Sequence, residues 1–263
     1  MYSLAEALDG RYSVPKTFSA RARAMSTETD YLQNYDASRF PAPIVTVDSV
    51  LFTVHQEQLC VLMVKRANHP FQGRWGLPGG FIDLQRDDST GATAQRKLME
   101  KTGIAPPYLA QLASFSGRER DPRGWSLTTV YFALIAHADC QAHIADVDDA
   151  AWLPLATLRT QPLAFDHLTI IDAALQRLRQ KTAYSMLPVY CLPTEFTLSQ
   201  LQEVMEIILD RSVQRKSLMR RFEAAEMFED TGKMMATGAR KARLYRKKAG
   251  VDMRNFSRNL MVE

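Results

Sequence analysis

The sequence is poor in the residues that build disulfide frameworks and zinc sites. Among its 263 residues are three cysteines and five histidines. The cysteines, Cys60, Cys140 and Cys191, are odd in number and far apart, and the histidines lack the spacing of paired metal ligands. Scattered, unpaired cysteines are typical of a reduced compartment. We therefore expect a cytoplasmic protein with neither a disulfide framework nor a zinc site.

Long hydrophobic runs are also missing. The longest, Val130 to Ala136, is much shorter than the roughly 20 residues that a membrane-spanning helix needs. The N-terminus lacks the apolar region of a signal peptide. With 46% hydrophobic and 24% charged residues, the composition is that of a globular protein with one large domain or two smaller ones. We expect no association with a membrane.

Acidic side chains are missing from a stretch that otherwise follows a known motif. Residues 74–104 contain a glycine-rich loop, an acidic bend and a helical segment that ends at a glycine. This order resembles the Nudix box, which is a glycine, five residues, a glutamate, seven residues and then Arg-Glu-U-x-Glu-Glu-x-Gly-U, where U is aliphatic. The residues that fit the box are Gly80, Arg96, Leu98, Glu100, Gly103 and Ile104.

Two positions depart from the box, because Lys97 and Lys101 replace glutamates. Residues three and four apart share a helix face, and Mg²⁺ on that face would need carboxylate oxygens. An ammonium about 4 Å from the ion would repel it by roughly 8 kcal/mol at an effective dielectric of about 20. Asp88 has the spacing from Arg96 of the box's first glutamate, which leaves Asp88 and Glu100 as remnants of a metal site. We predict a box that keeps its shape, with no catalytic residues and no need for Mg²⁺.

Residues 31–185 have the pattern of a mixed sheet between helices, which is the α+β layout of a Nudix fold. Apolar runs and helical spacing supply the expected elements. These are strands over 43–54 and 59–66, a helix over 93–102, strands on both sides of a loop at 118–125, and a helix over about 166–178. Residues 1–40 lack clear periodicity, and we expect residues 1–30 to be a disordered extension.

Two prolines and the absence of a period predict a linker over residues 186–195. The linker separates the Nudix-like region from a second domain over 196–263. Thr197 and Gln200 have the spacing of a capping box, in which each side chain hydrogen-bonds the other residue's backbone amide at a helix start. An apolar stripe follows, so a helix is expected from Thr197 onward.

A second helix is predicted over residues 212–224, with Ser212 as its N-cap. The side chains expected to face a core are those of Leu218, Phe222 and Ala225. Short strands over 227–230 and 243–248 enclose a basic loop that contains glycine. Two helices followed by a basic hairpin are the outline of a winged helix-turn-helix domain.

Positive charge is concentrated near the C-terminus. Residues 1–185 contain 19 Lys and Arg and 19 Asp and Glu, whereas residues 211–258 contain 14 and 5, a net charge of +9. This asymmetry indicates an anionic partner, and a basic helix face suits the major groove of double-stranded DNA. The alternatives are a solvated basic surface and an RNA-binding module, for which no aromatic stacking platform is evident. The residues predicted to bind DNA are Arg215, Lys216, Ser217, Arg220, Arg221, Lys233, Arg240, Lys241 and Arg243.

A second set of basic residues lies in the Nudix-like region. Guanidinium groups suit phosphate oxygens and an indole suits base stacking, which favours a nucleotide site in such a fold. The alternative is an ordinary surface loop. The residues predicted to bind an effector are Lys65, Arg66, Arg74, Gly79, Gly80, Arg118, Arg120, Asp121, Arg123 and Trp125.

The two regions together resemble the NrtR family, the Nudix-related transcriptional regulators of NAD metabolism. The segments that carry this resemblance are 31–52, 65–83, 120–134, 196–204 and 231–246. The resemblance implies a bacterial repressor that binds palindromic DNA as a homodimer and is released by ADP-ribose or a related nucleotide. It implies no other cofactor. The alternative is an active Nudix hydrolase of ADP-ribose or another nucleoside diphosphate derivative, with an accessory basic domain.

Overall fold

The structure, a computed structural model, describes residues 27–103, 105–139, 150–237 and 240–251, together with 253, 255–257, 259 and 260. The side chains at 101, 102, 237 and 240 lie outside this description. The chain divides into two compact units, residues 1–42 and 43–263. Within the described residues, no helix combines the length and the apolar character needed to cross a membrane.

The described part of the first unit, residues 27–42, contains two short helices, α1 (Glu28–Gln33) and the 3₁₀ helix η2 (Ala37–Arg39). The Thr27 side chain accepts a hydrogen bond from the Asp30 amide, and the Asp36 side chain accepts one from the Ser38 amide. Both caps satisfy amides that the first turn leaves unpaired. The predicted disordered extension over 1–30 is therefore wrong for residues 27–30, and residues 1–26 lie outside the described residues.

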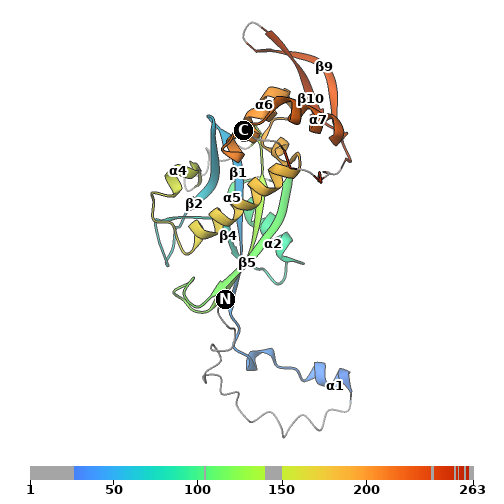
Figure 1. Cartoon of the computed structure of the whole chain (residues 1–263). Coiled ribbons are helices and arrows are strands. Elements are labelled where there is room, and N and C mark those ends of the chain that lie inside the picture. The colour runs from blue at the N-terminus through green and yellow to red at the C-terminus, as the bar shows by residue number, and fades with distance from the viewer. Residues whose placement is uncertain are drawn as a thin grey trace, which may run out of the picture. The chain divides into compact units, whose positions relative to one another are not determined.

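A mixed sheet forms the centre of the second unit (Figure 1). Its main path runs β3-β2-β1-β6-β5, with β4 paired to β1 and β7 paired to β2. β1 and β6 are parallel and their other partners are antiparallel. The strands are β1 (Ile44–His55), β2 (Gln58–Lys65), β3 (Trp75–Gly76), β4 (Gly79–Phe81), β5 (Tyr108–Gly117), β6 (Ser126–Leu134) and β7 (Ala150–Pro154). The predicted strands are confirmed.

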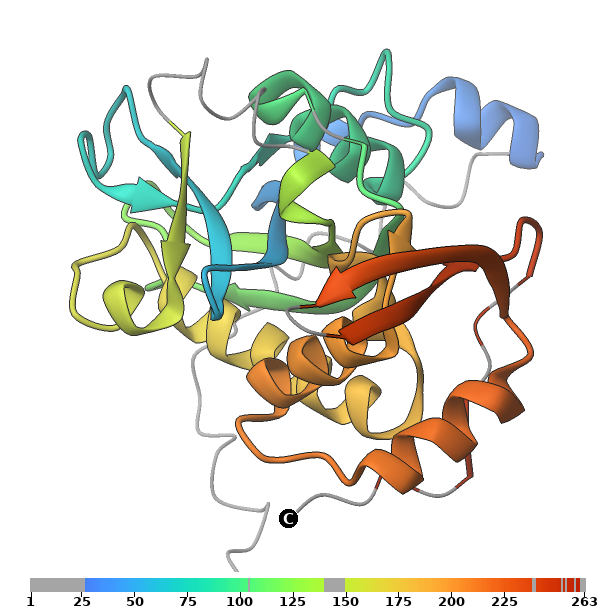
Figure 2. The same cartoon turned by 90° about the horizontal axis from the view of Figure 1, so that it is seen from above.

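Helices α2 (Thr90–Thr102) and α5 (His167–Tyr184) cover opposite faces of this sheet (Figure 2). Successive residues of β1 point to opposite faces. Phe52 packs in one core cluster with Ile170 of α5, and Leu51 packs in another with Leu98 of α2. The left-handed Gly103, with φ 65°, ends α2 as predicted. Short helices η3 (His137–Asp139) and α4 (Leu155–Leu158) complete this part.

The segment 186–195, predicted to be a linker, is packed into the protein. It forms the 3₁₀ helix η4 (Leu187–Cys191), and Met186, Leu187 and Val189 are all buried. The same core cluster continues into the C-terminal helices. Pro188 lies in the first turn of η4 and Pro193 follows its end. Most of the segment is buried, and Pro193 and Thr194 are exposed.

Two helices and a three-stranded sheet follow. They are α6 (Leu198–Leu209), α7 (Arg215–Ala225), and strands β8 (Glu195–Phe196), β9 (Phe228–Thr237) and β10 (Arg240–Lys247) in the order β8-β10-β9. Thr197 and Gln200 form the predicted capping box. The rings of Phe222 and Phe228 stack 4.3 Å apart, which packs α7 on the sheet. The winged helix-turn-helix fold is confirmed.

Two predicted details of this domain are wrong. Helix α7 begins at Arg215, and its N-cap is Gln214, which makes no side-chain capping bond, so Ser212 does not cap it. The expected loop between short strands is mostly strand, because β9 and β10 pair from Phe228–Lys247 up to Thr237–Arg240. Figure 1 shows the resulting long hairpin extending away from α6 and α7.

Candidate functional site

The Nudix-box helix is held by an ion pair between Arg96 and Asp87 that the sequence analysis did not predict. The Arg96 Nε donates to Asp87 Oδ1 over 2.6 Å, and Arg96 Nη2 contacts Asp87 Oδ2. The Asp87 side chain is only 1% exposed. The hydrogen bonds from Arg96 lower the pKa of this carboxyl below its usual value. Asp87, and not the exposed Asp88, is therefore the partner of Arg96.

The remaining carboxylate of the box is surrounded by cations. Glu100 accepts from Arg96 Nη1 at 2.9 Å and from Lys97 Nζ at 3.2 Å, and Arg86 lies 3.6 Å away. Hydrogen bonds from Arg96 and Lys97 lower the pKa of Glu100. Among the described residues, no group of three or more His, Cys, Asp or Glu side chains is placed to hold a metal ion. Lys97 thus pairs with the one described carboxylate of the box helix, while the Lys101 side chain lies outside the described residues.

Lys97 also lies against Gly80 of β4. A Cβ added at Gly80 would be 3.1 Å from Lys97 Cε, and Gly80 has φ 155°. A Cβ added at Gly79 would be 2.2 Å from Asp48 Oδ1. Both glycines lie in β4, paired with β1, and their lack of a side chain allows the close approach of Asp48 and Lys97. The side chain of Asp48 is buried and accepts from Thr128 Oγ1 at 2.8 Å.

Two of the predicted effector-binding arginines are held by carboxylates. Arg120 donates to both oxygens of Asp166, at 3.1 and 3.0 Å, and to Ser126 Oγ at 3.1 Å. Arg123 donates to Asp121 over 3.0 and 2.7 Å. Burial raises the pKa of Asp121, but the hydrogen bonds from the side chain and backbone of Arg123 outweigh it, so the net pKa is lowered. These pairs fix the orientation of both guanidinium groups.

Aromatic rings complete this arginine-rich cluster. The guanidinium carbon of Arg66 lies 4.7 Å from the Phe165 ring centroid, and that of Arg74 lies 5.3 Å from the Phe71 centroid. Phe71 and Phe165 meet edge to face at 4.9 Å. The Arg66 Nε donates to the Pro70 carbonyl over 2.7 Å. Stacking on aromatic faces favours the flat guanidinium over a lysine ammonium.

A buried histidine lies beneath the cluster. His167 Nδ1 accepts from the Leu77 amide over 2.9 Å, and a Cβ at Gly76 would lie 3.2 Å from the same nitrogen. Burial lowers the pKa of His167, and Arg120 and Arg66 also lower it, against the effects of nearby carboxylates. Because Nδ1 accepts a hydrogen bond, the proton of the neutral ring lies on Nε2.

The structure brings together only part of the predicted effector set. Seven of the ten belong to the cluster or to β4: Arg66, Arg74, Arg120, Asp121, Arg123, Gly79 and Gly80. Lys65, Arg118 and Trp125 are exposed. The sequence reasoning missed Asp48, Phe71, Phe165, Asp166 and His167. A carboxylate inside an apolar strand was the available signal for Asp48, but nothing marked the other four.

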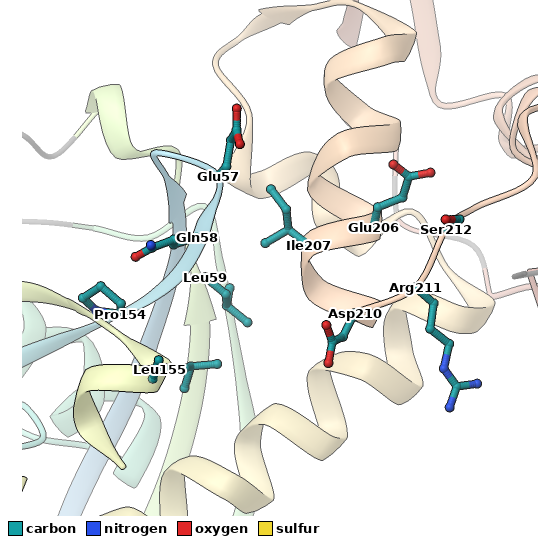
Figure 3. Close-up of a pocket in the computed structure, with 11 residues that line it drawn as sticks. Glu57, Gln58, Leu59, Pro154, Leu155, Glu206, Ile207, Asp210, Arg211 and Ser212 are labelled. Carbon is teal, nitrogen blue, oxygen red and sulfur yellow. The ribbon is translucent and has the colours of Figure 1, made fainter. Parts of the chain in front are cut away.

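A groove of about 610 Å³ lies elsewhere, between the sheet and the winged helix (Figure 3). One side is formed by the β1–β2 turn and the start of α4, and the other by the end of α6. None of the predicted effector-binding residues lines it. The lining residues are Glu57, Gln58, Leu59, Pro154, Leu155, Ala156, Glu206, Ile207, Asp210, Arg211 and Ser212.

The turn between α6 and α7 is fixed by side chains of α6. Glu206 Oε1 accepts from the Val213 amide over 2.9 Å, and Gln202 Nε2 donates to the Val213 carbonyl over 3.1 Å. Arg215 donates to Gln202 Oε1 over 2.9 Å and to Ser199 over 3.3 Å. Both backbone groups of the buried Val213 are thus satisfied, which orients α7 against α6.

Helix α7 presents a basic outer face. Leu218, Phe222 and Ala225 are buried as predicted, whereas Lys216 and Arg220 are exposed. Arg221, predicted to bind DNA, is instead 8% exposed. Its Nη1 donates to the Ala183 carbonyl over 2.6 Å, and its guanidinium carbon lies 4.8 Å from the Phe256 ring centroid. Arg221 therefore does not belong to the outer face.

Several hairpin cations have acidic partners. Lys233 Nζ is 2.8 Å from Glu195, and Arg243 Nη1 is 3.1 Å from Asp230. Lys241 is exposed, and the side chain of Arg240 lies outside the described residues. Lys241, one of the hairpin cations predicted to contact DNA, is thus exposed near the hairpin tip. The ion pairs of Lys233 and Arg243 reduce the net positive charge of the hairpin further from its tip.

Comparison with known proteins gives the same two-part order. Residues 43–174 match the NUDIX domain family, and residues 188–247 match the NrtR DNA-binding winged helix domain. The ADPR responsive transcriptional repressor NtrR of Acinetobacter baylyi is 43% identical over 221 residues, which is 84% of this chain and 88% of that protein.

Two solved structures are similar to this chain. Shewanella oneidensis NrtR in complex with a 27mer DNA has 49% identity and a TM-score of 0.78, over 82% of this chain and 99% of that one. The NUDIX domain of the same protein in complex with ADP ribose has 54% identity and a TM-score of 0.54, over 58% of this chain and 99% of that one. The predicted fold and the resemblance are confirmed.

Proposed function

Since the chain belongs to the NrtR family, in which a Nudix domain precedes a DNA-binding winged helix, we propose that it is a transcriptional repressor of NAD-metabolism genes. ADP-ribose or a related nucleotide releases it from DNA. The observation that carries the proposal is the exposed pair Lys216 and Arg220 on α7, whose opposite face is buried. The effector-sensing domain spans residues 31–185, and the DNA-binding domain spans 196–263.

The outer face of α7 has the chemistry that double-stranded DNA requires. Leu218 and Phe222 hold the helix on the core, so Lys216 and Arg220 point away from it. Such side chains reach phosphates and base edges when a helix enters the major groove. The proposed secondary contacts with DNA are those of Arg215, Ser217, Lys233, Arg240, Lys241 and Arg243. A homodimer on a palindromic operator, in the cytoplasm, gives two such helices about one helical turn apart.

The arginine cluster suits a nucleoside diphosphate derivative. Arg66, Arg74, Arg120 and Arg123 offer guanidinium groups for the two phosphates. Their pairing with carboxylates and rings holds them in place before a ligand arrives, which lowers the ordering cost of binding. The exposed Lys65, Arg118 and Trp125 are proposed to close over the ligand, and Gly79 and Gly80 to let it approach the backbone.

We also propose that this domain binds its ligand without cleaving it. Cleavage of a diphosphate by a Nudix site depends on Mg²⁺ bound to carboxylates. The described carboxylate on the box helix, Glu100, already accepts hydrogen bonds from Arg96 and Lys97. The alternative is an active hydrolase in which Asp88 and Glu100 hold one metal ion.

Two measurements on the full chain test the proposal. A double-stranded DNA selected by the protein from a random-sequence pool is titrated with protein, by fluorescence anisotropy, with and without ADP-ribose. Tight binding that ADP-ribose weakens supports the proposal, and DNA binding that ADP-ribose leaves unchanged removes the effector claim. Phosphomonoester products are then assayed after incubation with ADP-ribose and Mg²⁺ or Mn²⁺. Substantial turnover would favour the hydrolase.

A further inference from the structure

Helix α5 connects the arginine cluster with the winged helix. At its start, Asp166 accepts two hydrogen bonds from Arg120, and His167 accepts the Leu77 amide. Phe165, directly before it, packs against Arg66 and Phe71. Any ligand that engages Arg120 or Arg66 therefore acts on groups attached to the first turn of α5.

The last turn of α5 is bound by the C-terminal part of the chain. Helix ends leave carbonyl oxygens without partners in the helix. The Ala183 carbonyl accepts from Arg221 Nη1 and from the Leu260 amide, each over 2.6 Å. The Tyr184 carbonyl accepts from the Phe256 amide over 2.7 Å. Both carbonyls thus receive donors from α7 or from the segment that follows the hairpin.

Arg221 lies where three parts of the chain meet. Its guanidinium contacts the end of α5 and the ring of Phe256, while Arg221 itself belongs to α7. It is 8% exposed, although Arg220 beside it in the sequence is exposed. Arginine remains charged when buried, so this position carries a desolvation cost that an apolar residue would avoid. The guanidinium offsets part of this desolvation cost with a directional hydrogen bond to the end of α5.

A second arginine ties α5 to the turn before α7. Arg179 Nε donates to the Ile208 carbonyl over 2.9 Å, and its Nη2 lies 3.5 Å from Asp210. Asp210 has the left-handed φ of 57° that ends α6. Figure 3 shows Asp210 at this end of α6, beside the groove. The end of α6 and the body of α7 are therefore both hydrogen-bonded to α5.

We propose that Arg221 is a positioning residue for DNA recognition, through which α5 sets the orientation of α7 according to the state of the arginine cluster. This inference rests on the proposed ADP-ribose-responsive DNA binding. It deepens that function by assigning the connection between the two sites. Arg221 acts on DNA affinity through α7, and its contacts are with the Ala183 carbonyl and Phe256.

The test is the coupling ratio, which is the Kd for the selected DNA with saturating ADP-ribose divided by the Kd without it. Coupling between two sites typically gives a ratio of about 5 to 150. In Arg221→Gln the ratio is expected to fall to within about threefold of one, because the connection from α5 to α7 is lost. The ADP-ribose Kd of the DNA-free variant is expected to equal that of the parent.

Arg220→Gln is the matched control, one residue away on the same helix. It removes a proposed DNA contact, so it should weaken DNA binding equally with and without ADP-ribose and leave the ratio unchanged. A purely structural role for Arg221 would give this same pattern. By reciprocity, DNA should weaken ADP-ribose binding in the parent and in Arg220→Gln, but not in Arg221→Gln.

Phe256→Leu provides an independent variant in case Arg221→Gln does not fold, since it weakens the stacking on Arg221 and keeps the hydrogen bond of the Phe256 amide. A reduced ratio supports the proposal. A parental ratio in every folded variant overturns it. A parental protein whose DNA affinity does not respond to ADP-ribose at all overturns the proposed function itself, which is a separate result.

Discussion

Lys97 Nζ lies 3.2 Å from Glu100 Oε2, across one turn of α2. Arg96 donates to the other oxygen of the same carboxylate. A carboxylate with two cationic donors gains little from a divalent ion, because the ion would have to displace the arginine or come close to the ammonium. The contact thus pairs the charge of Glu100 with two cations of its own helix.

Binding of ADP-ribose should not depend on divalent cations. We expect the Kd measured by calorimetry to be the same with Mg²⁺ and with EDTA. In Lys97→Glu, a second carboxylate lies three residues before Glu100 and shares its helix face, so this variant should gain Mn²⁺ binding, detected by proton relaxation enhancement. Lys97→Gln is the control, since it removes the ammonium without adding a ligand. Loss of ADP-ribose binding in EDTA would contradict the metal-free site.

The exposed cations of α7 should determine part of the salt dependence of DNA binding. Each phosphate contact contributes about 0.9 to the slope of log K against log salt concentration. In Lys216→Ala/Arg220→Ala, the slope should fall by about 2 and the affinity should decrease. Arg159→Ala is the control, because Arg159 is also exposed but pairs with Asp172 near α4 and α5. Equal slopes in the parent and the double variant would mean that α7 does not face DNA.

The side chain of Glu206 should affect DNA binding through the turn and not through its charge. Glu206→Ala leaves the Val213 amide without its acceptor, which should lower the free energy of unfolding by about 1–3 kcal/mol and weaken DNA binding. Glu206→Gln keeps an acceptor oxygen and should bind DNA at least as tightly as the parent. Both variants lose the same negative charge, so similar affinities in the two would refute the geometric role. Urea unfolding and anisotropy provide the measurements.

Sequence predictions were more accurate for interactions between residues close together in the chain than for interactions between distant ones. The Thr197–Gln200 capping box and the Gly103 helix end depend on neighbours in the chain, and both were predicted correctly. Arg221 was predicted to bind DNA, whereas its guanidinium donates to the Ala183 carbonyl, 38 residues away in the chain. Local spacing contains no information on such a contact.

The arginine cluster shows the same limit. Charge and residue type were sufficient to select Arg120 and Arg123, but Asp166 lies 46 residues from Arg120. Asp88 has the spacing of the box's first glutamate, but the carboxylate that pairs with Arg96 is Asp87, because the bend that directs Asp87 toward Arg96 is set by hydrogen bonds with Asp83. The box spacing alone did not reveal this bend.

His167 should make the free energy of unfolding fall at mildly acidic pH. Burial lowers its pKa in the folded protein, so below pH about 6.5 the unfolded chain binds a proton that the folded protein excludes. This contributes up to about 1.4 kcal/mol per pH unit. His137 also has a pKa lowered by burial and adds to the same window, whereas the lowered carboxyl pKa values act at lower pH.

His167→Asn separates these contributions. The asparagine side-chain oxygen can still accept a hydrogen bond from the Leu77 amide, but the side chain does not titrate. The slope of the unfolding free energy against pH should therefore decrease by up to the contribution of one proton, about 1.4 kcal/mol per pH unit. The absolute stability should also fall, because the ring contact with Phe165 is lost. Urea unfolding between pH about 5 and 7 measures both quantities. The slope shows whether His167 titrates on unfolding. A smaller side chain lowers the stability at every pH, whereas only the loss of a titrating group reduces the dependence of stability on pH. An unchanged slope would show that His167 is protonated in the folded protein, which would break its hydrogen bond to Leu77.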